Sequence, residues 1–190
     1  MPYTAVALFV LLLVVVLLGF FAFVAYNEIV ALNQRINKAW ANIDVALKQR
    51  FDELPSLVSA VRGMMGFEQD VLTRVTALRN AYSGEASVPE QAATSEATSQ
   101  AVRQLFATVE RYPDLKSATN VLALQTEIQR LESVIADRRE LYNDSVARYN
   151  IRIRQLPAVL LAGLFGWQAR DFFAVSDDQR QVAPVELSGT

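Results

Sequence analysis

The stretch IVALNQRINKAWANIDVALKQRF, residues 29–51, decides the fold, because its apolar side chains recur at helical spacing. They follow steps of three, four and four residues, first from Ile29 to Trp40 and again from Trp40 to Phe51. The mean period of about 3.67 residues predicts one nearly straight amphipathic helix rather than a strand or an ordinary heptad coil. The spacing continues beyond Pro55, a residue that we expect to kink or restart the helix.

Upstream of that stretch the chain is apolar, with no Asp, Glu, Lys or Arg before Glu28. A helix of about 21 residues rises roughly 32 Å, enough to cross the hydrocarbon core of a bilayer. A signal peptide would need a basic start and a cleavage site with small residues, which this segment lacks. We therefore expect residues 1–25 to be an uncleaved transmembrane anchor.

The expected topology follows from the basic residues beside the anchor. Arg35, Lys38 and Lys48 follow it, whereas no Lys or Arg precedes it. The positive-inside rule therefore predicts a single-pass protein of the cell (inner) membrane, with the N-terminus outside and the C-terminal domain in the cytoplasm.

Downstream, the spacing of apolar residues predicts further helices separated by turn signals. A turn is expected at Gly63–Gly66, and a helix over about residues 67–82. The next helix is expected to begin near Pro89, which suits a first helical turn, and to end at the RYPD sequence of residues 111–114. A last helix carries apolar residues from Val121 onward and is expected to reach Pro157.

These helices and the lack of a strand pattern predict an all-α fold. We expect an N-terminal transmembrane helix that continues into an elongated antiparallel bundle of about four helices. The expected parts are an anchor at 1–25, a bundle at 26–155, a short apolar segment at 156–173 and a polar tail at 174–190.

Composition argues against several kinds of functional site. The 18 Lys and Arg residues nearly balance the 20 Asp and Glu residues, so no basic field points to nucleic acid. The chain has no cysteine and no histidine, which removes thiolate nucleophiles, the commonest metal ligands and the usual general base. We therefore expect a protein that is not an enzyme and has no cofactor, no metal ion and no nucleic-acid partner.

Several motifs together resemble the LemA family of bacterial membrane proteins. They are YNEIV (26–30), AWANIDVALKQRFDELPSLVSAVRG (39–63), YPDLK (112–116), RRELYNDSVARYN (138–150) and LLAGLFG (160–166). The resemblance covers most of residues 26–173 and implies a membrane-anchored helical bundle. A branch of the family that resembles magnetosome membrane proteins implies a part in shaping or organising membranes. Other members are associated with membrane metalloproteases of the HtpX kind. The family has no established catalytic residues, so the resemblance assigns none here.

Three polar groups have both a structural and a functional interpretation. Asp44 and Lys48 lie four residues apart, which predicts a surface ion pair rather than a catalytic base. Solvated helix charges are favoured for Arg138 and Arg139 over a grip on an acidic partner or a lipid phosphate. Asp114 is expected to cap the next helix rather than to form a binding loop.

The helix lengths predict an interface between copies of the chain. The two middle helices are too short to cover the membrane-proximal halves of the first and last helices, so apolar stripes there would stay open. The residues expected to form this interface are Ile29, Ile36, Trp40, Tyr142, Val146, Tyr149 and Ile153.

The sequence LPAVLLAGLFGW, residues 156–167, is apolar but too short to cross a bilayer. The expected path of the chain returns it to the membrane surface, where it would lie in the headgroup region or pack on neighbouring anchors. The alternative is a short core helix that folds back on the bundle. The residues expected to contact lipid are Arg148, Arg152, Arg154, Leu160, Leu161, Leu164, Phe165 and Trp167.

Together these features predict a non-enzymatic, membrane-anchored scaffold that homo-oligomerises and organises or shapes the membrane. Its expected partners are membrane lipid and further copies of itself. The alternative is an adaptor subunit for an HtpX-like membrane protease or another membrane enzyme. The two differ in one observable, because a scaffold should form large homo-oligomers when it is expressed alone.

Overall fold

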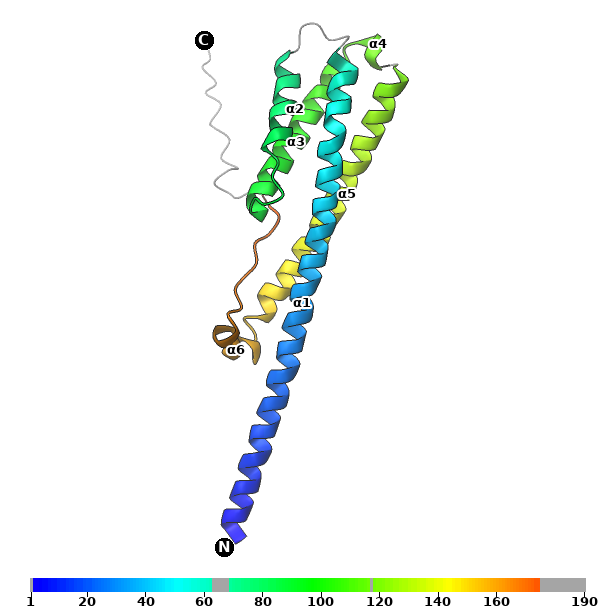
Figure 1. Cartoon of the computed structure of the whole chain (residues 1–190). Helices are drawn as coiled ribbons and strands as arrows, with labels where there is room; N and C mark the ends of the chain where they lie inside the picture. The colour runs from blue at the N-terminus through cyan, green and yellow to red at the C-terminus, as the bar shows by residue number, and fades with distance from the viewer. Residues whose placement is uncertain (1, 63–68, 117, 175–190) are drawn as a thin grey trace, which may run out of the picture. The chain divides into compact units, whose positions relative to one another are not determined.

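The computed structural model describes residues 2–62, 69–116 and 118–174 (Figure 1). Its elements are helices only: α1 (Pro2–Arg62), α2 (Gln69–Ala81), α3 (Val88–Val109), α4 (Pro113–Lys116), α5 (Thr119–Arg152) and α6 (Ala158–Phe165). The all-α prediction is confirmed. The turn expected at Gly63–Gly66 and the tail from residue 175 onward lie outside the described residues.

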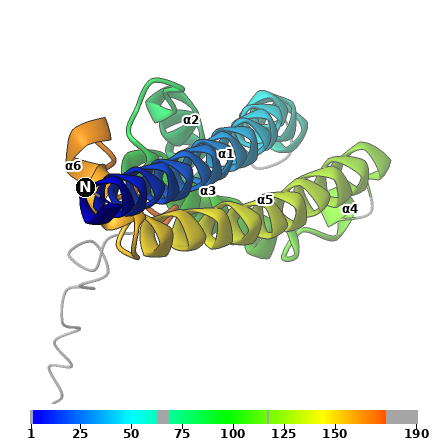
Figure 2. The same cartoon turned by 90° about the horizontal axis from the view of Figure 1, so that it is seen from below.

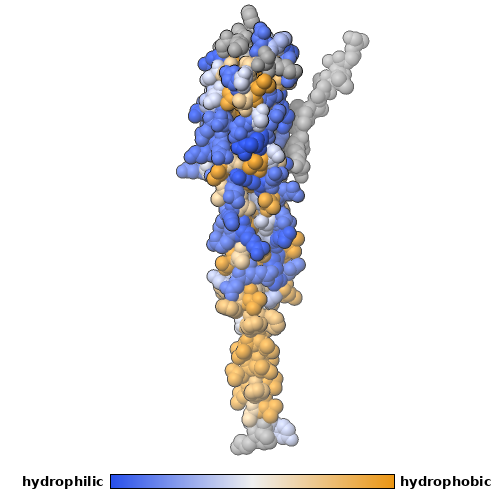
Figure 3. Space-filling view, turned by 90° about the vertical axis from the view of Figure 1, so that its right-hand side faces the viewer, coloured by the Kyte–Doolittle hydropathy of each residue, from blue (hydrophilic) through white to orange (hydrophobic). Residues whose placement is uncertain are grey.

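The first helix, α1, is continuous over 61 residues. Its N-terminal part is the one helix segment among the described residues that is long and apolar enough to cross a membrane. Figure 3 shows this part as an uninterrupted apolar surface. This supports a single membrane anchor near the N-terminus.

The expected restart at Pro55 does not occur, because α1 continues through it to Arg62. A proline inside a helix removes one backbone hydrogen bond and costs about 3 kcal/mol. Its neighbours Leu54, Leu57 and Val58 are buried on one side of α1. Burial of that apolar face offsets the missing hydrogen bond, so the helix continues.

The start of α3 agrees with the sequence. Ser87 precedes the helix and Pro89 is its second residue. The Glu90 carboxylate accepts hydrogen bonds from the backbone N–H of Ser87 (2.8 Å) and from its hydroxyl (2.7 Å). This contact satisfies a backbone donor that the first turn of a helix would otherwise leave open.

Two expected boundaries were wrong. The last long helix, α5, ends at Arg152 and not at Pro157. The chain turns there, with the Arg154 N–H donating to the Ile151 carbonyl. Asp114 lies within the first turn of α4 rather than before it. Its charge is still at the end of a helix that favours an anion.

The chain forms two compact units that do not follow its linear order. Unit 1 comprises Met1–Ala39 and Tyr142–Arg170, and unit 2 comprises Trp40–Leu141 and Asp171–Thr190. Both α1 and α5 contribute to each unit. In unit 2, the upper part of Figure 1, the long helices reverse direction one after another, as expected for an antiparallel bundle.

Each unit has its own apolar core. The core of unit 2 takes side chains from α1, α2, α3 and α5, among them Ile43, Leu47, Leu57, Val75, Leu105, Ile128 and Leu131. In unit 1, α5 lies along α1, as both Figure 1 and Figure 2 show. The buried residues there are Ala25, Ile29, Ile36, Tyr142, Val146, Tyr149, Ile153 and Ala158.

Candidate functional site

The residues expected to join copies of the chain are buried within a single chain. Six of the seven, all in unit 1, are buried, with an exposed fraction of 0% at Ile36 and 6% at Ile153. The seventh, Trp40, is partly buried in unit 2 and its ring lies 6.0 Å from the ring of Phe173. The prediction that these stripes stay uncovered was therefore wrong.

The reason is the path of the chain after α5. It returns along unit 1 and is fixed there by Asn150, whose side chain exchanges two hydrogen bonds with the backbone of Arg170 (2.8 and 2.9 Å). The Arg170 guanidinium also donates to the Asn37 side chain on α1 (3.2 Å). Residues 153–170 thus form a third layer that the helix lengths alone did not reveal.

Within this layer, α6 presents most of its apolar side chains to the outside. Ala158 is buried, whereas Leu160 is 75% exposed and Leu164 is 79% exposed. A core helix would bury such leucines, so α6 does not fit the alternative of a helix inside the bundle. The helix ends at Gly166, which adopts a left-handed conformation with φ 66°, and the Trp167 N–H donates to the Ala162 carbonyl (2.9 Å).

An aromatic cluster joins the end of α6 to the end of the membrane span. The ring centroid of Tyr26 lies 5.0 Å from that of Phe165 and 6.2 Å from that of Trp167. Phe165 and Trp167 are stacked at 5.2 Å. Tyrosine and tryptophan favour the boundary between hydrocarbon and water, because each has an apolar ring and one polar atom. The cluster therefore places α6 beside the part of α1 where the apolar span gives way to polar sequence (Figure 1).

Two of the three arginines expected to face lipid have acidic partners in the chain. Arg152 pairs with Glu28 on α1 (2.6 Å), and Arg148 pairs with Asp144 one turn earlier on α5 (3.0 Å). Arg154 is exposed just before α6. The positive charge available to a lipid headgroup is therefore smaller than the sequence suggested.

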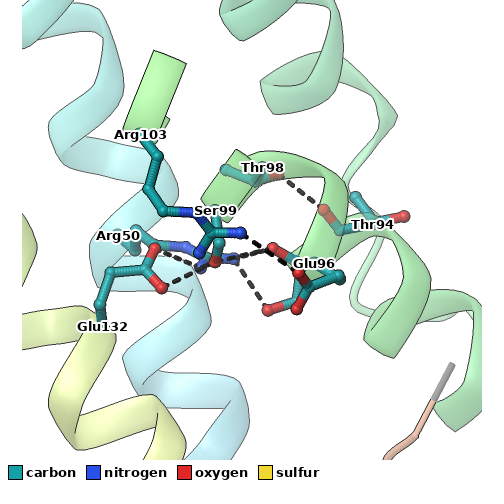
Figure 4. A network of polar contacts seen from close by, with 8 residues as sticks. Arg50, Thr94, Glu96, Thr98, Ser99, Arg103 and Glu132 are labelled. Atoms are coloured by element: carbon teal, nitrogen blue, oxygen red, sulfur yellow. Dashed lines mark hydrogen bonds and ion pairs between the residues drawn. The ribbon is translucent and has the colours of Figure 1, made fainter. Parts of the chain in front are cut away.

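A second polar site lies inside unit 2, where Arg50 of α1 has an exposed fraction of 0% (Figure 4). Its guanidinium donates to the Ser99 hydroxyl (2.9 Å), the Ser95 hydroxyl (3.0 Å) and the Glu132 carboxylate (2.8 Å). The Ser99 hydroxyl in turn donates to the other oxygen of Glu132 (2.7 Å). This one cation therefore connects α1, α3 and α5.

Burial lowers the pKa of Arg50, and the attraction of Glu132 opposes that effect. Even a lowered arginine pKa stays far above neutral, so the group is a permanent buried cation. A cavity of about 180 Å³ beside the network keeps one side of Glu132 open to solvent. The arrangement holds charge and does not present a free nucleophile or base. Among the described residues, no three acidic side chains are grouped to hold a metal ion.

The sequence contained a signal for this network that was missed. Arg50 follows Leu47 by three residues and precedes Leu54 by four, so it occupies a position on the buried face of α1. A charged residue in such a position is almost never buried without a partner. The partners, however, come from residues 45 to 82 positions away, which spacing along one helix does not reveal.

The other polar candidates have structural partners. Asp44 accepts a hydrogen bond from the Tyr82 hydroxyl (2.8 Å), a contact that the expected pairing with Lys48 did not anticipate. Burial, followed by this hydrogen bond, raises the pKa of Tyr82. Arg138 donates to the backbone carbonyl of Asn42, and Arg139 lines the cavity beside the Arg50 network. These contacts favour the structural interpretation of Asp44 and Arg138.

Comparison with known proteins gives relatives of two kinds. The magnetosome protein MamQ 2 of Paramagnetospirillum magneticum is 36% identical over 73 residues, which are 38% of this chain and 27% of that protein. Magnetosome protein MamQ of Magnetospirillum gryphiswaldense matches with the same identity and coverage. The chain therefore spans about a quarter of the length of these magnetosome proteins.

Protein LemA of Metamycoplasma hominis is 28% identical over 152 residues, which are 76% of this chain and 68% of that protein. A profile of the LemA family matches residues 39–187, which include unit 2 and the return of the chain through α6. The anchor lies outside this match, while α6, the arginine network and most of α1 after the anchor lie inside it. The chain belongs to the LemA family.

Proposed function

We propose that this protein is a non-enzymatic scaffold of the cell membrane, held by its anchor and by α6, that self-associates and organises or shapes the bilayer. The observation that carries the proposal is the position of α6. Its leucines are exposed beside the end of an anchor that is itself exposed and apolar. A short apolar helix that lies in the headgroup boundary displaces lipid in one leaflet, and such binding depends on curvature.

Two further features support a scaffold rather than an enzyme. The chain has no histidine and no cysteine, and the buried guanidinium of Arg50 is paired with Glu132. The likeness to magnetosome proteins agrees with a role at a membrane, although it covers about a quarter of their length. Copies would meet through the lipid-facing side chains of α1 and α6, because the stripes first expected to join them are buried.

The proposed topology has the N-terminus outside and the rest of the chain in the cytoplasm. Arg35 and Lys38 follow the anchor in unit 1, and the return of the chain adds Arg148, Arg152 and Arg154 to the same unit. Basic residues near the end of a span favour the cytoplasmic side, whether or not they are paired with acids.

The full-length protein reconstituted into phospholipid vesicles tests this function. The wild type should change the distribution of vesicle diameters seen by electron cryomicroscopy, and copies should crosslink to one another. The double variant Leu160→Asp and Leu164→Asp should lose both effects, because charge on the exposed side of α6 opposes its entry into the headgroup boundary. Leu122→Asp, on the exposed side of α5 in unit 2, is the matched control. Equal vesicle diameters and equal crosslinking for all three proteins would contradict the proposal.

A further inference from the structure

A groove of about 410 Å³ separates α1 from α6 in unit 1. Each helix contributes three residues to it: Ala22, Phe23, Tyr26, Leu161, Leu164 and Phe165. The only polar side-chain atom among these residues is the hydroxyl oxygen of Tyr26. Such a lining favours an apolar occupant, because water in the groove would find almost no hydrogen-bond partner.

The polarity of the groove changes along α1. Ala22 and Phe23 belong to the exposed apolar span, and Tyr26 follows about one helical turn later with its hydroxyl group. Glu28 comes next and pairs with Arg152, whose guanidinium also donates to the backbone carbonyl of Leu156 just before α6. Along α1 the groove therefore begins with apolar side chains, continues with an aromatic hydroxyl and ends at an ion pair. A phospholipid has the same order of polarity, from its apolar acyl chain to its charged headgroup.

We propose that this groove holds one acyl chain of a membrane phospholipid, whose phosphate lies beside Tyr26 and the Glu28–Arg152 pair. The proposal rests on the proposed function, because it requires α6 to lie in the bilayer. The groove adjoins the part of α1 that is long and apolar enough to cross a membrane, and a bilayer around that part would supply the ligand.

The narrow spacing between the two walls of the groove favours a lipid acyl chain over a second helix as the occupant. The rings of Tyr26 and Phe165 approach to 5.0 Å between centroids and join the two walls. An α-helix with its side chains is about 10–12 Å across, which is too wide to enter between helices joined in this way. A single chain of methylene groups is narrow enough and flexible enough to fit.

The test compares groove-filling variants with a control on the same helix. All proteins are full-length and carry Trp40→Phe, so that Trp167 is the one remaining tryptophan. Ala22→Phe and Leu161→Phe fill the groove from its two walls. Val24→Phe adds a ring to the same turn of α1 at an exposed residue that does not line the groove. Each protein is reconstituted with a phosphatidylglycerol whose acyl chain carries a photoreactive diazirine, then irradiated, purified in mild detergent and analysed by mass spectrometry.

We expect the protein with an unfilled groove, which carries only Trp40→Phe, and the Val24→Phe control to give the same yield of lipid adducts on α6. In each groove-filling variant the yield of these adducts should fall about tenfold. This is the ratio expected when burial of about two methylene groups is removed. Equal yields of lipid adducts on α6 in all four proteins would overturn the proposal.

Fluorescence of Trp167 in the same samples separates this proposal from the proposed function. Lipids brominated near the headgroup should quench Trp167 in every variant if α6 lies in the bilayer. If Trp167 is quenched but the groove-filling variants lose no adducts, the proposal that α6 lies in the bilayer stands and only the proposal of a lipid in the groove fails. Without quenching in any protein, the proposed function and the groove would both fail.

Discussion

Arg50 and Glu132 form an ion pair of 2.8 Å although 82 positions separate them in the sequence. The pair crosses from α1 to α5 within unit 2, and two serines of α3 accept further hydrogen bonds from the guanidinium. A buried cation is costly when its partner is lost, whereas the intact pair adds little net stability. The network therefore fixes which faces of the three helices meet.

Removal of the carboxylate should destabilise the protein strongly. Glu132→Ala leaves the Arg50 guanidinium buried without its anion, and we expect a loss of about 3 kcal/mol in the free energy of unfolding. Glu127→Ala breaks an exposed pair with Arg130 on the same helix, and its effect on stability should be small because solvent screens that pair. Chemical denaturation in mild detergent measures both values.

The apolar replacement of both partners provides the complementary test. Arg50→Met with Glu132→Leu should recover most of the stability lost in Glu132→Ala, because no unpaired charge is then buried. If the double variant is as unstable as Glu132→Ala alone, the loss of stability in Glu132→Ala does not come from the unpaired Arg50 cation.

The apolar stripe of unit 1 should behave as a core and not as an interface. Ile36→Ala removes a fully buried side chain and should lower the free energy of unfolding by about 2–5 kcal/mol. Ile151→Ala makes the same chemical change at an exposed residue of α5 in the same unit, and its effect should be small. Tryptophan fluorescence during denaturation reports the stability, and mass photometry reports the number of copies. If Ile36→Ala lowered the number of copies per particle and left the free energy of unfolding unchanged, the stripe would be an interface between copies and not a core.

Alkaline pH should weaken unit 2 through Tyr82. An unfolded tyrosine ionises near a pKa of about 10, whereas burial and the hydrogen bond to Asp44 raise the pKa of Tyr82 in the fold. The stability from this group is therefore complete below the unfolded pKa and is lost as the pH rises through about 10 toward the folded pKa. Tyr82→Phe should make the free energy of unfolding fall less steeply above about pH 10. Asp44→Asn, which keeps an acceptor without its charge, should have an intermediate slope. Parallel slopes for the three proteins would exclude Tyr82 as the source.

The absence of cysteine permits a direct test of the proposed topology. Tyr3→Cys and Ser133→Cys each introduce a single thiol at an exposed residue, the first at the N-terminal end of the anchor and the second on α5. A membrane-impermeant maleimide added to intact cells should label Tyr3→Cys and should label Ser133→Cys only after lysis. Labelling of Ser133→Cys in intact cells would reverse the orientation.

The sequence was sufficient for the elements that depend on local spacing. The step from Ile29 to Trp40 predicted a helical face, and Ile29 and Ile36 are buried on it. Pro89 predicted the start of α3 because a proline fits a first turn. The charge-free run before Glu28 predicted the anchor from length alone. Each of these inferences needs only neighbours along the chain.

The predictions that were wrong depend on contacts between residues that are distant in the sequence. Pro55 was read as an interruption because the sequence does not show how much apolar surface its neighbours bury. The stripes of unit 1 were read as uncovered because helix lengths do not show that Asn150 holds the backbone of Arg170. The spacing of apolar residues along the helices also did not show that Phe173 is buried with its ring near that of Trp40 in unit 2. In each case the deciding partner lies elsewhere in the chain.

The contact between Tyr26 and Phe165 can form only late in synthesis, because the two residues lie far apart in the sequence. Unit 1 is discontinuous, since its first segment ends at Ala39 and its second begins at Tyr142. At about 5–20 residues per second, the ribosome needs roughly 7–28 seconds to pass from one ring to the other. During that interval the anchor has already entered the membrane while Ile29 and Ile36 still lack the residues that cover them. A ribosome that stalls before Phe165 therefore leaves an inserted chain with an open apolar stripe, the kind of nascent product that chaperones and membrane quality-control proteases recognise.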